Sequence, residues 1–285
     1  MNWLINALTA PTNILWAALI SAILSTVIAS LSRLGEVRDK ARVDYEYAQR
    51  KALSELVGRN IGGVLNAAES MSHRLWNLYQ NHGQSWLVER NGYYLQSSVY
   101  RFLALAALLR QVAGSAILLD ARLSAKREFT FLNYVAALHW VMTDVSLFDG
   151  LIYDAGEEKD HFFSDNYRTY ADLCWSDGKV LTFDAFKEKI ANDEKAASVI
   201  NFFMNLKPEK DRYRWDRLVA LHLLLLAFIN TFGYKRQFSE QSQFDEVAGQ
   251  IRHQKVLSNL LNWLDRHDLT DRQAEKIRGA ADAPP

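Results

Sequence analysis

The chain has 285 residues, of which 49% are hydrophobic and 23% charged, a composition that excludes a disordered protein. Its 33 basic and 33 acidic side chains cancel, so there is no net field to attract DNA or RNA, although a local basic patch is compatible with this balance. The single cysteine, Cys174, excludes an intramolecular disulfide and fits a reducing compartment.

The N-terminal segment is apolar, and Arg33 is its first charged side chain. From Ile14 to Leu31 the sequence reads ILWAALISAILSTVIASL, eighteen residues that are all apolar or small hydroxyl residues. With its polar flanks this run matches the helix of about 20 residues that crosses a bilayer core of about 30 Å. The sequence therefore predicts a transmembrane helix over residues 13–32, preceded by a short external or interfacial N-terminus over residues 1–12.

Two other interpretations of this segment are open. A cleaved signal peptide has a basic start and an apolar core of about 7–15 residues. Here the start, MNWLINALTAPTN, has no lysine or arginine, and the apolar run is longer. A buried helix of a soluble fold would carry a polar face, which this segment lacks, so the membrane-spanning helix is favoured.

Basic residues follow the predicted span, and none precedes it. By the positive-inside rule this places the body of the protein in the cytoplasm and the N-terminus outside, with the bacterial inner (plasma) membrane as the expected location. The membrane-proximal basic residues are Arg33, Arg38, Lys40 and Arg42.

Small residues recur three and four positions apart within the span, which places them on one side of the helix. Such a side lets the backbones of neighbouring helices approach closely, so we expect the chain to form homo-oligomers in the lipid bilayer. The residues of this small-residue face are Ala18, Ala22, Ser25, Ala29 and Ser32.

The body is expected to be all-α, because no segment shows convincing period-two alternation. A helical stalk is predicted over residues 33–57, ended by glycines, followed by a cytoplasmic multi-helix bundle over residues 58–280 and a disordered tail over residues 281–285. The glycines are Gly58, Gly62 and Gly63. Helices of the bundle are expected at about residues 65–79, 93–122, 125–153, 167–175, 182–207, 213–232, 239–265 and 270–280, with the very apolar 213–232 at its centre.

Arg217 and His222 have the R-x4-H spacing, which resembles the motif of the all-helical HEPN ribonucleases. In that chemistry the histidine transfers a proton and the arginine stabilises the charge of the phosphate. The resemblance is confined to these two positions, and the polar residue that usually follows the arginine is Leu218 here. A structural arginine and a buried histidine are therefore favoured, and a membrane-tethered ribonuclease is the alternative.

The segment from Asp154 to Asp165, DAGEEKDHFFSD, is rich in potential metal ligands, with Glu157, Asp160 and His161 as the candidates. It lacks the EF-hand spacing, so a solvated acidic loop is favoured and no metal or other cofactor is expected. The sequence contains no phosphate-loop, dinucleotide-binding, zincin or serine-hydrolase motif. These observations lean against an enzyme.

The segments RLWNLY, from Arg74 to Tyr79, and YLQSSVYRFLALAALLRQVAGSAILLD, from Tyr94 to Asp120, resemble a group of uncharacterised bacterial proteins. In that group an R-L-[YW]-N-[IL]-Y segment precedes a long helix that ends in a leucine-aspartate pair. The resemblance covers residues 70–174. It implies a bacterial source, one N-terminal membrane helix and an all-α body, and it implies no activity.

The leading hypothesis is a membrane-anchored cytoplasmic sensor or interaction protein that binds an unidentified cytoplasmic protein and assembles through its anchor. By analogy with stress and phage-defence effectors, it would act at the inner membrane through oligomerisation. The alternatives are the ribonuclease and a passive membrane scaffold.

Overall fold

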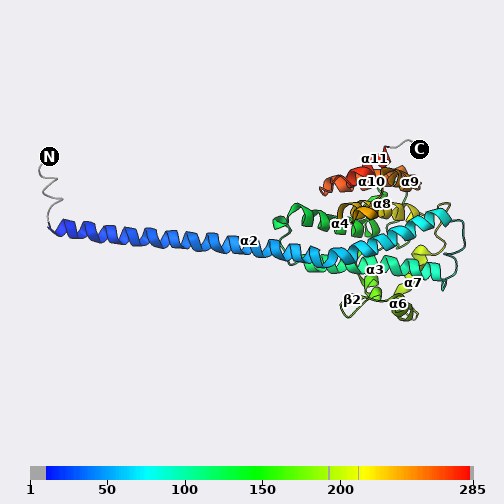
Figure 1. Ribbon diagram of the computed structural model, residues 1–285, viewed down its shortest axis with the longest axis horizontal. Helices are drawn as coiled ribbons and strands as arrows, with labels where there is room; N and C mark the ends of the chain where they lie inside the picture. Colours follow the sequence, from blue (N-terminus) through cyan, green and yellow to red (C-terminus); the bar gives the residue numbers. More distant parts are fainter. Residues whose placement is uncertain (1–10, 192, 211, 283–285) are drawn as a thin grey trace. The chain divides into compact units, whose positions relative to one another are not determined.

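The computed structural model describes residues 11–191, 193–210 and 212–282, with side chains from Trp16 onward. These residues form an almost entirely α-helical fold, as predicted (Figure 1). The chain divides into two compact units, of which the first ends at Lys51 and the second begins at Ala52. Residues 1–10 of the predicted N-terminal segment and residues 283–285 of the predicted tail lie outside the described residues.

Helix α2 (Pro11–Asn81) is continuous and longer than the sequence indicated. The expectation that three glycines end it is wrong, and the separate helix expected over residues 65–79 is its last part. A glycine costs about 1 kcal/mol relative to alanine inside a helix. Burial of neighbouring side chains such as Val57 and Val64 offsets that cost here. The three glycines are Gly58, Gly62 and Gly63.

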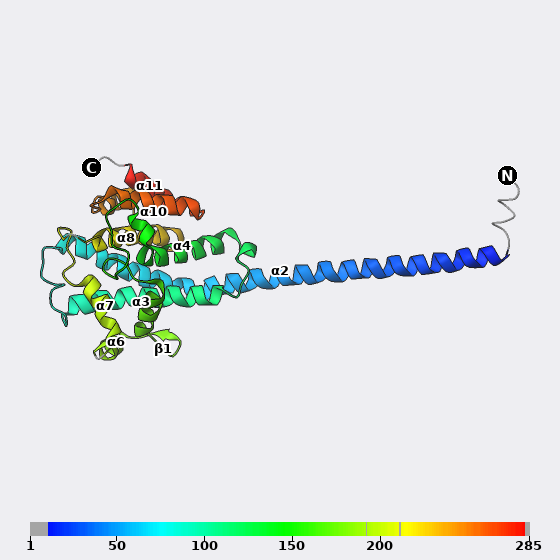
Figure 2. The same cartoon turned by 180° about the vertical axis from the view of Figure 1, so that it is seen from behind.

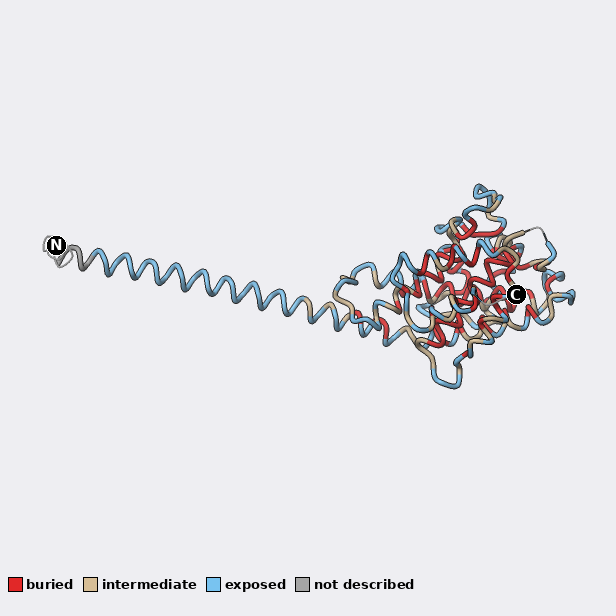
Figure 3. Tube along the Cα trace, turned by 90° about the horizontal axis from the view of Figure 1, so that it is seen from above, coloured by how far each residue is buried: buried red, intermediate tan, exposed pale blue. Residues whose placement is uncertain are grey.

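The second unit is a bundle built around α8 (Arg214–Phe232), in which all but the last two residues are buried. This confirms the prediction that the most apolar helix of the body forms its centre. The buried residues, which are red in Figure 3, belong to this unit. The other helices are α3 (Tyr93–Ala116), α4 (Lys126–Thr143), α5 (Ser164–Ala171), α6 (Phe183–Ile190), α7 (Lys195–Phe203), α9 (Gln241–Ala248), α10 (Gln254–Arg266) and α11 (Ala274–Ala281).

Neighbouring helices cover α8 from several sides. Helices α4, α9, α10 and α11 pack on it, and hydrogen bonds join it to the last part of α2. Helix α3 lies beside that part of α2 in both Figure 1 and Figure 2, and its other neighbours include α4, α5 and α7. The second unit therefore contains a core of its own, to which residues 52–81 of α2 contribute.

Several expected helices are shorter than predicted. The helix expected over residues 93–122 ends at Ala116, and a short 3-10 helix, η1 (Ala121–Leu123), follows it. The helix expected over residues 125–153 ends at Thr143, because Asp144 adopts an extended conformation and its carboxylate caps the next turn, η2 (Val145–Phe148).

Two expected helices are each divided in two. The segment 182–207 forms α6 and α7, and the segment 239–265 forms α9 and α10, which are separated just after α9 by Gly249. Short 3-10 turns complete the connections; they are η3 (Asp172–Cys174) and η4 (Lys235–Gln237).

A small hairpin interrupts the helices. Strands β1 (Trp175–Ser176) and β2 (Lys179–Val180) pair in antiparallel fashion. The residues between them, Asp177 and Gly178, have φ values of 51° and 74°. An Asp-Gly pair with two positive φ angles is the preferred connection of a tight hairpin, which explains why the chain folds back on itself here.

Candidate functional site

In the first unit, the predicted span is an exposed apolar helix. No part of its most apolar window is buried, and its large side chains, such as Ile23 and Leu31, are about half exposed or more. Helix α8 is also long and apolar enough to cross a membrane, but 89% of it is buried in the second unit. The N-terminal helix is therefore an apolar surface for which the described residues supply no protein cover, and its length and composition suit a bilayer.

The small-residue face lies on this exposed helix. The hydroxyl of Ser25 donates to the carbonyl of Ala22 at 3.0 Å, and that of Thr26 donates to the same carbonyl at 2.7 Å. Both hydroxyls are thus satisfied within the helix, as an apolar environment requires. The predicted face, Ala18, Ala22, Ser25, Ala29 and Ser32, and the basic set that follows it, Arg33, Arg38, Lys40 and Arg42, are all exposed.

Arg217 is fully buried and holds the backbone of two distant segments. Its guanidinium donates to the carbonyls of Val141, Asp144 and Asp160, at 3.1 Å in the case of Asp144. It also lies over the ring of Phe148, with 4.5 Å between Cζ and the ring centroid. Burial lowers the pKa of Arg217 to about 10, which leaves it charged at neutral pH.

His222 is also fully buried, and its contacts differ from those of Arg217. Its Nε2 lies 2.9 Å from the hydroxyl of Ser72, and its ring packs against Tyr79. The structure therefore directs the two residues of the R-x4-H spacing to separate partners. Because both side chains are 0% exposed, a substrate phosphate has no access to either one in this conformation.

The acidic segment is committed to internal contacts. Asp160 is buried and accepts hydrogen bonds from Nε of Arg212 and from the backbone N–H of Arg214. His161 bonds to the hydroxyl of Tyr153 through Nδ1. Within the described ranges no group of three histidine, cysteine, aspartate or glutamate side chains could hold a metal ion.

Two more acidic side chains of this segment, Glu157 and Glu158, also have partners. Glu157 forms an exposed ion pair with Lys159. Glu158 accepts a hydrogen bond from the hydroxyl of Tyr170 at 2.8 Å. Nothing in the local spacing indicates this contact, because it joins the loop to a helix that follows it.

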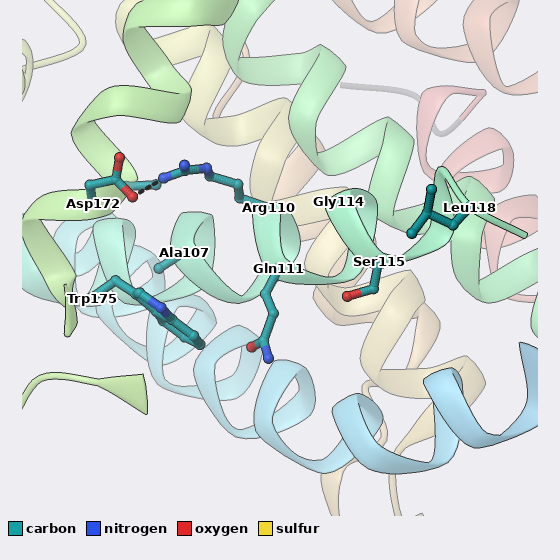
Figure 4. Close-up of a pocket in the computed structure, with 9 residues that line it drawn as sticks. Ala107, Arg110, Gln111, Gly114, Ser115, Leu118, Asp172 and Trp175 are labelled. Carbon is teal, nitrogen blue, oxygen red and sulfur yellow. Dashed lines mark hydrogen bonds and ion pairs between the residues drawn. The ribbon is translucent and has the colours of Figure 1, made fainter. Parts of the chain in front are cut away.

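Two hollows flank the last turns of α3. The first has a volume of about 440 Å³ and is shown in Figure 4, where Arg110 crosses toward Asp172 and forms an ion pair with it, while Gln111 and Ser115 line the rim. The second, about 460 Å³, lies between α3, α4 and α5 and is lined mainly by apolar side chains. His139 lines this second hollow, and burial, followed by the charge of Arg168, lowers its pKa.

A third hollow, of about 390 Å³, lies between the last part of α2 and the start of α3 and has a different character. Its lining is polar and aromatic and contains no carboxylate. We call it the basic pocket; it is formed by Ser70, His73, Arg74, Asn77, Tyr93, Tyr94 and Arg101. Sequence reasoning missed it, because its residues come together only when α3 folds back along α2.

Comparison with known proteins gives no match, whether with family models, with curated proteins or with solved structures.

Proposed function

We propose that this chain is a single-pass membrane protein whose second unit is a sensor or interaction domain. The observation that carries the proposal is the contrast between the two units. One contains an apolar helix whose large apolar side chains from Trp16 to Leu34 are exposed, and the other is a bundle with a large buried apolar core around α8. Lipid would cover the first without disturbing the second.

The proposal includes an orientation. Four basic residues follow the span within ten positions, and the chain before it has no lysine or arginine. In a bacterial inner membrane this difference favours an N-terminus outside and a second unit in the cytoplasm. The basic residues are Arg33, Arg38, Lys40 and Arg42.

The partners we propose are a second copy of the chain, through the small-residue face, and a cytoplasmic protein that contacts the second unit. By analogy with stress and phage-defence effectors, assembly of the spans would change the membrane when the second unit receives its signal. Depolarisation of expressing cells that disappears in the Ser25→Ile, Ala29→Ile variant supports this version. If expression does not change the membrane potential, the effector version is rejected and the passive scaffold remains.

Fractionation of expressing cells tests the anchor. The intact chain should sediment with membranes, resist extraction by high salt and dissolve in detergent. Replacing Ile20 and Val27 by lysine should release it, since each buried charge costs about 2.5–3.5 kcal/mol at the centre of a span. The control is Tyr47→Lys, which changes an exposed residue beyond the span. This variant should stay in the membrane fraction. A wild-type chain in the supernatant, or a mature N-terminus beyond Ser30, contradicts the proposal.

Orientation has its own test. In a Cys174→Ala background, a cysteine is placed either at Asn2 or at the exposed Gln84. A membrane-impermeant maleimide added to intact spheroplasts should label the first variant only, and both after lysis. Labelling of position 84 in intact spheroplasts would reverse the proposed orientation.

A further inference from the structure

We propose that the basic pocket binds the phosphate group of a small phosphorylated molecule. This inference concerns the second unit alone and goes beyond the proposed function, because it names a ligand that membrane anchoring does not require. It stands on the contacts of two arginines from neighbouring helices.

Arg74 of α2 and Arg101 of α3 are both half-buried and held in place by uncharged groups. Arg74 donates to the hydroxyl of Ser97 at 2.9 Å, and its Cζ lies 4.1 Å from the centroid of the Tyr94 ring. Arg101 donates to the hydroxyl of Ser70 at 3.1 Å and to the carbonyl of Ser97 at 2.9 Å. Both guanidinium groups are thus oriented by the fold before any ligand arrives.

No anion in the described part of the chain balances these two charges. Neither arginine forms an ion pair there, whereas Arg110, further along α3, is paired with Asp172. Burial, followed by the charge of Arg101, lowers the pKa of Arg74. Two adjacent, half-buried cations with no carboxylate partner repel one another, and an oxyanion between them would offset that repulsion.

Phosphate suits this geometry better than a single carboxylate would. Its oxygens accept from two guanidinium forks at once, and arginine is the residue that proteins use most for this purpose. His73 and Asn77, on the same face of α2 as Arg74, add further polar groups to the lining. The volume of about 390 Å³ falls in the range of about 300–1,000 Å³ typical of small-molecule sites.

The pocket has room beyond the phosphate, and its rim carries an aromatic side chain. Tyr93 is 67% exposed and contacts Phe183 edge to face. A phosphate on a nucleoside or on glycerol would satisfy the same arginines, so the chemistry common to both is a phosphate monoester.

Calorimetry on the full chain in detergent micelles tests the inference, with AMP, ATP, glycerol 3-phosphate, inorganic phosphate and uncharged adenosine as probes. At least one phosphate-bearing probe should bind, and adenosine should not. Binding of AMP or ATP alone identifies a nucleotide, and binding of glycerol 3-phosphate identifies a lipid-like headgroup. Absence of binding by every phosphate probe at millimolar concentration overturns the proposal, as does equal binding of adenosine and AMP.

Variants locate the site. Arg74→Gln and Arg101→Gln should each weaken binding about tenfold, the loss expected when one charge-assisted contact is removed. The matched control is Arg110→Gln, which removes the same charge from α3 outside the pocket and should change the dissociation constant less than about twofold. Circular dichroism checks that each variant folds. If Arg74→Gln does not fold, Arg101→Gln alone tests the site. Binding that survives in a folded arginine variant of the pocket refutes the assignment.

Discussion

The ring of His222 lies 2.9 Å from the hydroxyl of Ser72, in a fully buried contact that joins the central helix α8 to α2. The other ring nitrogen, Nδ1, has no partner among the described residues. Burial, reinforced by the nearby His73, lowers the pKa of His222 to about 3. The folded protein therefore holds this histidine neutral across the whole physiological range.

This contact predicts a pH-dependent stability. Between pH 6.5 and pH 3 the unfolded chain binds a proton at His222 and the folded chain does not. The free energy of unfolding should therefore fall as the pH is lowered through this window, by up to about 1.4 kcal/mol per pH unit from this residue. Urea unfolding of the full chain in mild detergent at pH 7.5, 6 and 5 measures the slope.

The variant His222→Gln isolates the contribution of His222, because glutamine does not titrate. Its unfolding free energy should depend less on pH than that of the wild type over the same interval. His267→Gln, which removes an exposed histidine from the end of α10, is the control and should retain the wild-type slope. Equal slopes in wild type and His222→Gln contradict the prediction.

Arg217 is expected to stabilise the fold. Replacing it by leucine leaves three carbonyl groups without their charged donor: the buried ones of Val141 and Asp160 and the part-buried one of Asp144. The loss should be about 3–5 kcal/mol in the free energy of unfolding, measured by urea titration. Arg110→Leu, which breaks an exposed ion pair on α3, should cost less than about 1 kcal/mol. Similar values for the two variants would show that the buried contacts contribute little.

His222 and Arg217, both on α8, show what the sequence could and could not predict. The apolar run of α8 correctly indicated the centre of an all-α bundle, because a helix of a folded domain that is apolar on all sides is covered by its neighbours. The R-x4-H spacing described two positions on one helix, but the role of each is decided by partners about 60 to 150 positions away in sequence. Local spacing carries no information about those partners.

The basic pocket escaped prediction for the same reason, since α2 and α3 contribute its residues jointly. The predicted end of α2 was wrong because it rested on the low helix propensity of three glycines. The packing of residues such as Val64 determines instead that the helix continues. The hairpin around Asp177 and Gly178 was not predicted, because strands of two residues are too short to show an alternating pattern.

A second buried charge should also prove structural. Asp216 is 0% exposed and accepts hydrogen bonds from the backbone N–H of Arg252 at 2.8 Å and from Nδ1 of His253 at 2.6 Å. Asp216→Asn removes the charge and places an amide donor among donors, so it should cost about 3 kcal/mol of unfolding free energy. Asp165→Asn, which alters an exposed pair with Arg168, should leave the urea midpoint unchanged. A stable Asp216→Asn variant would refute this role.

Self-association of the span is the remaining prediction. Enlarging the small-residue face with Ser25→Ile and Ala29→Ile should separate the helix backbones and lower the oligomer order in detergent, measured by light scattering that separates protein from detergent mass. Val27→Ile enlarges the opposite side of the same helix, half a turn away, and should leave the order unchanged. Because all three substitutions introduce an apolar side chain, membrane insertion should be retained in both variants. A wild-type oligomer that persists in the double variant would assign assembly to other surfaces, and a wild-type monomer would remove the proposed role of this face.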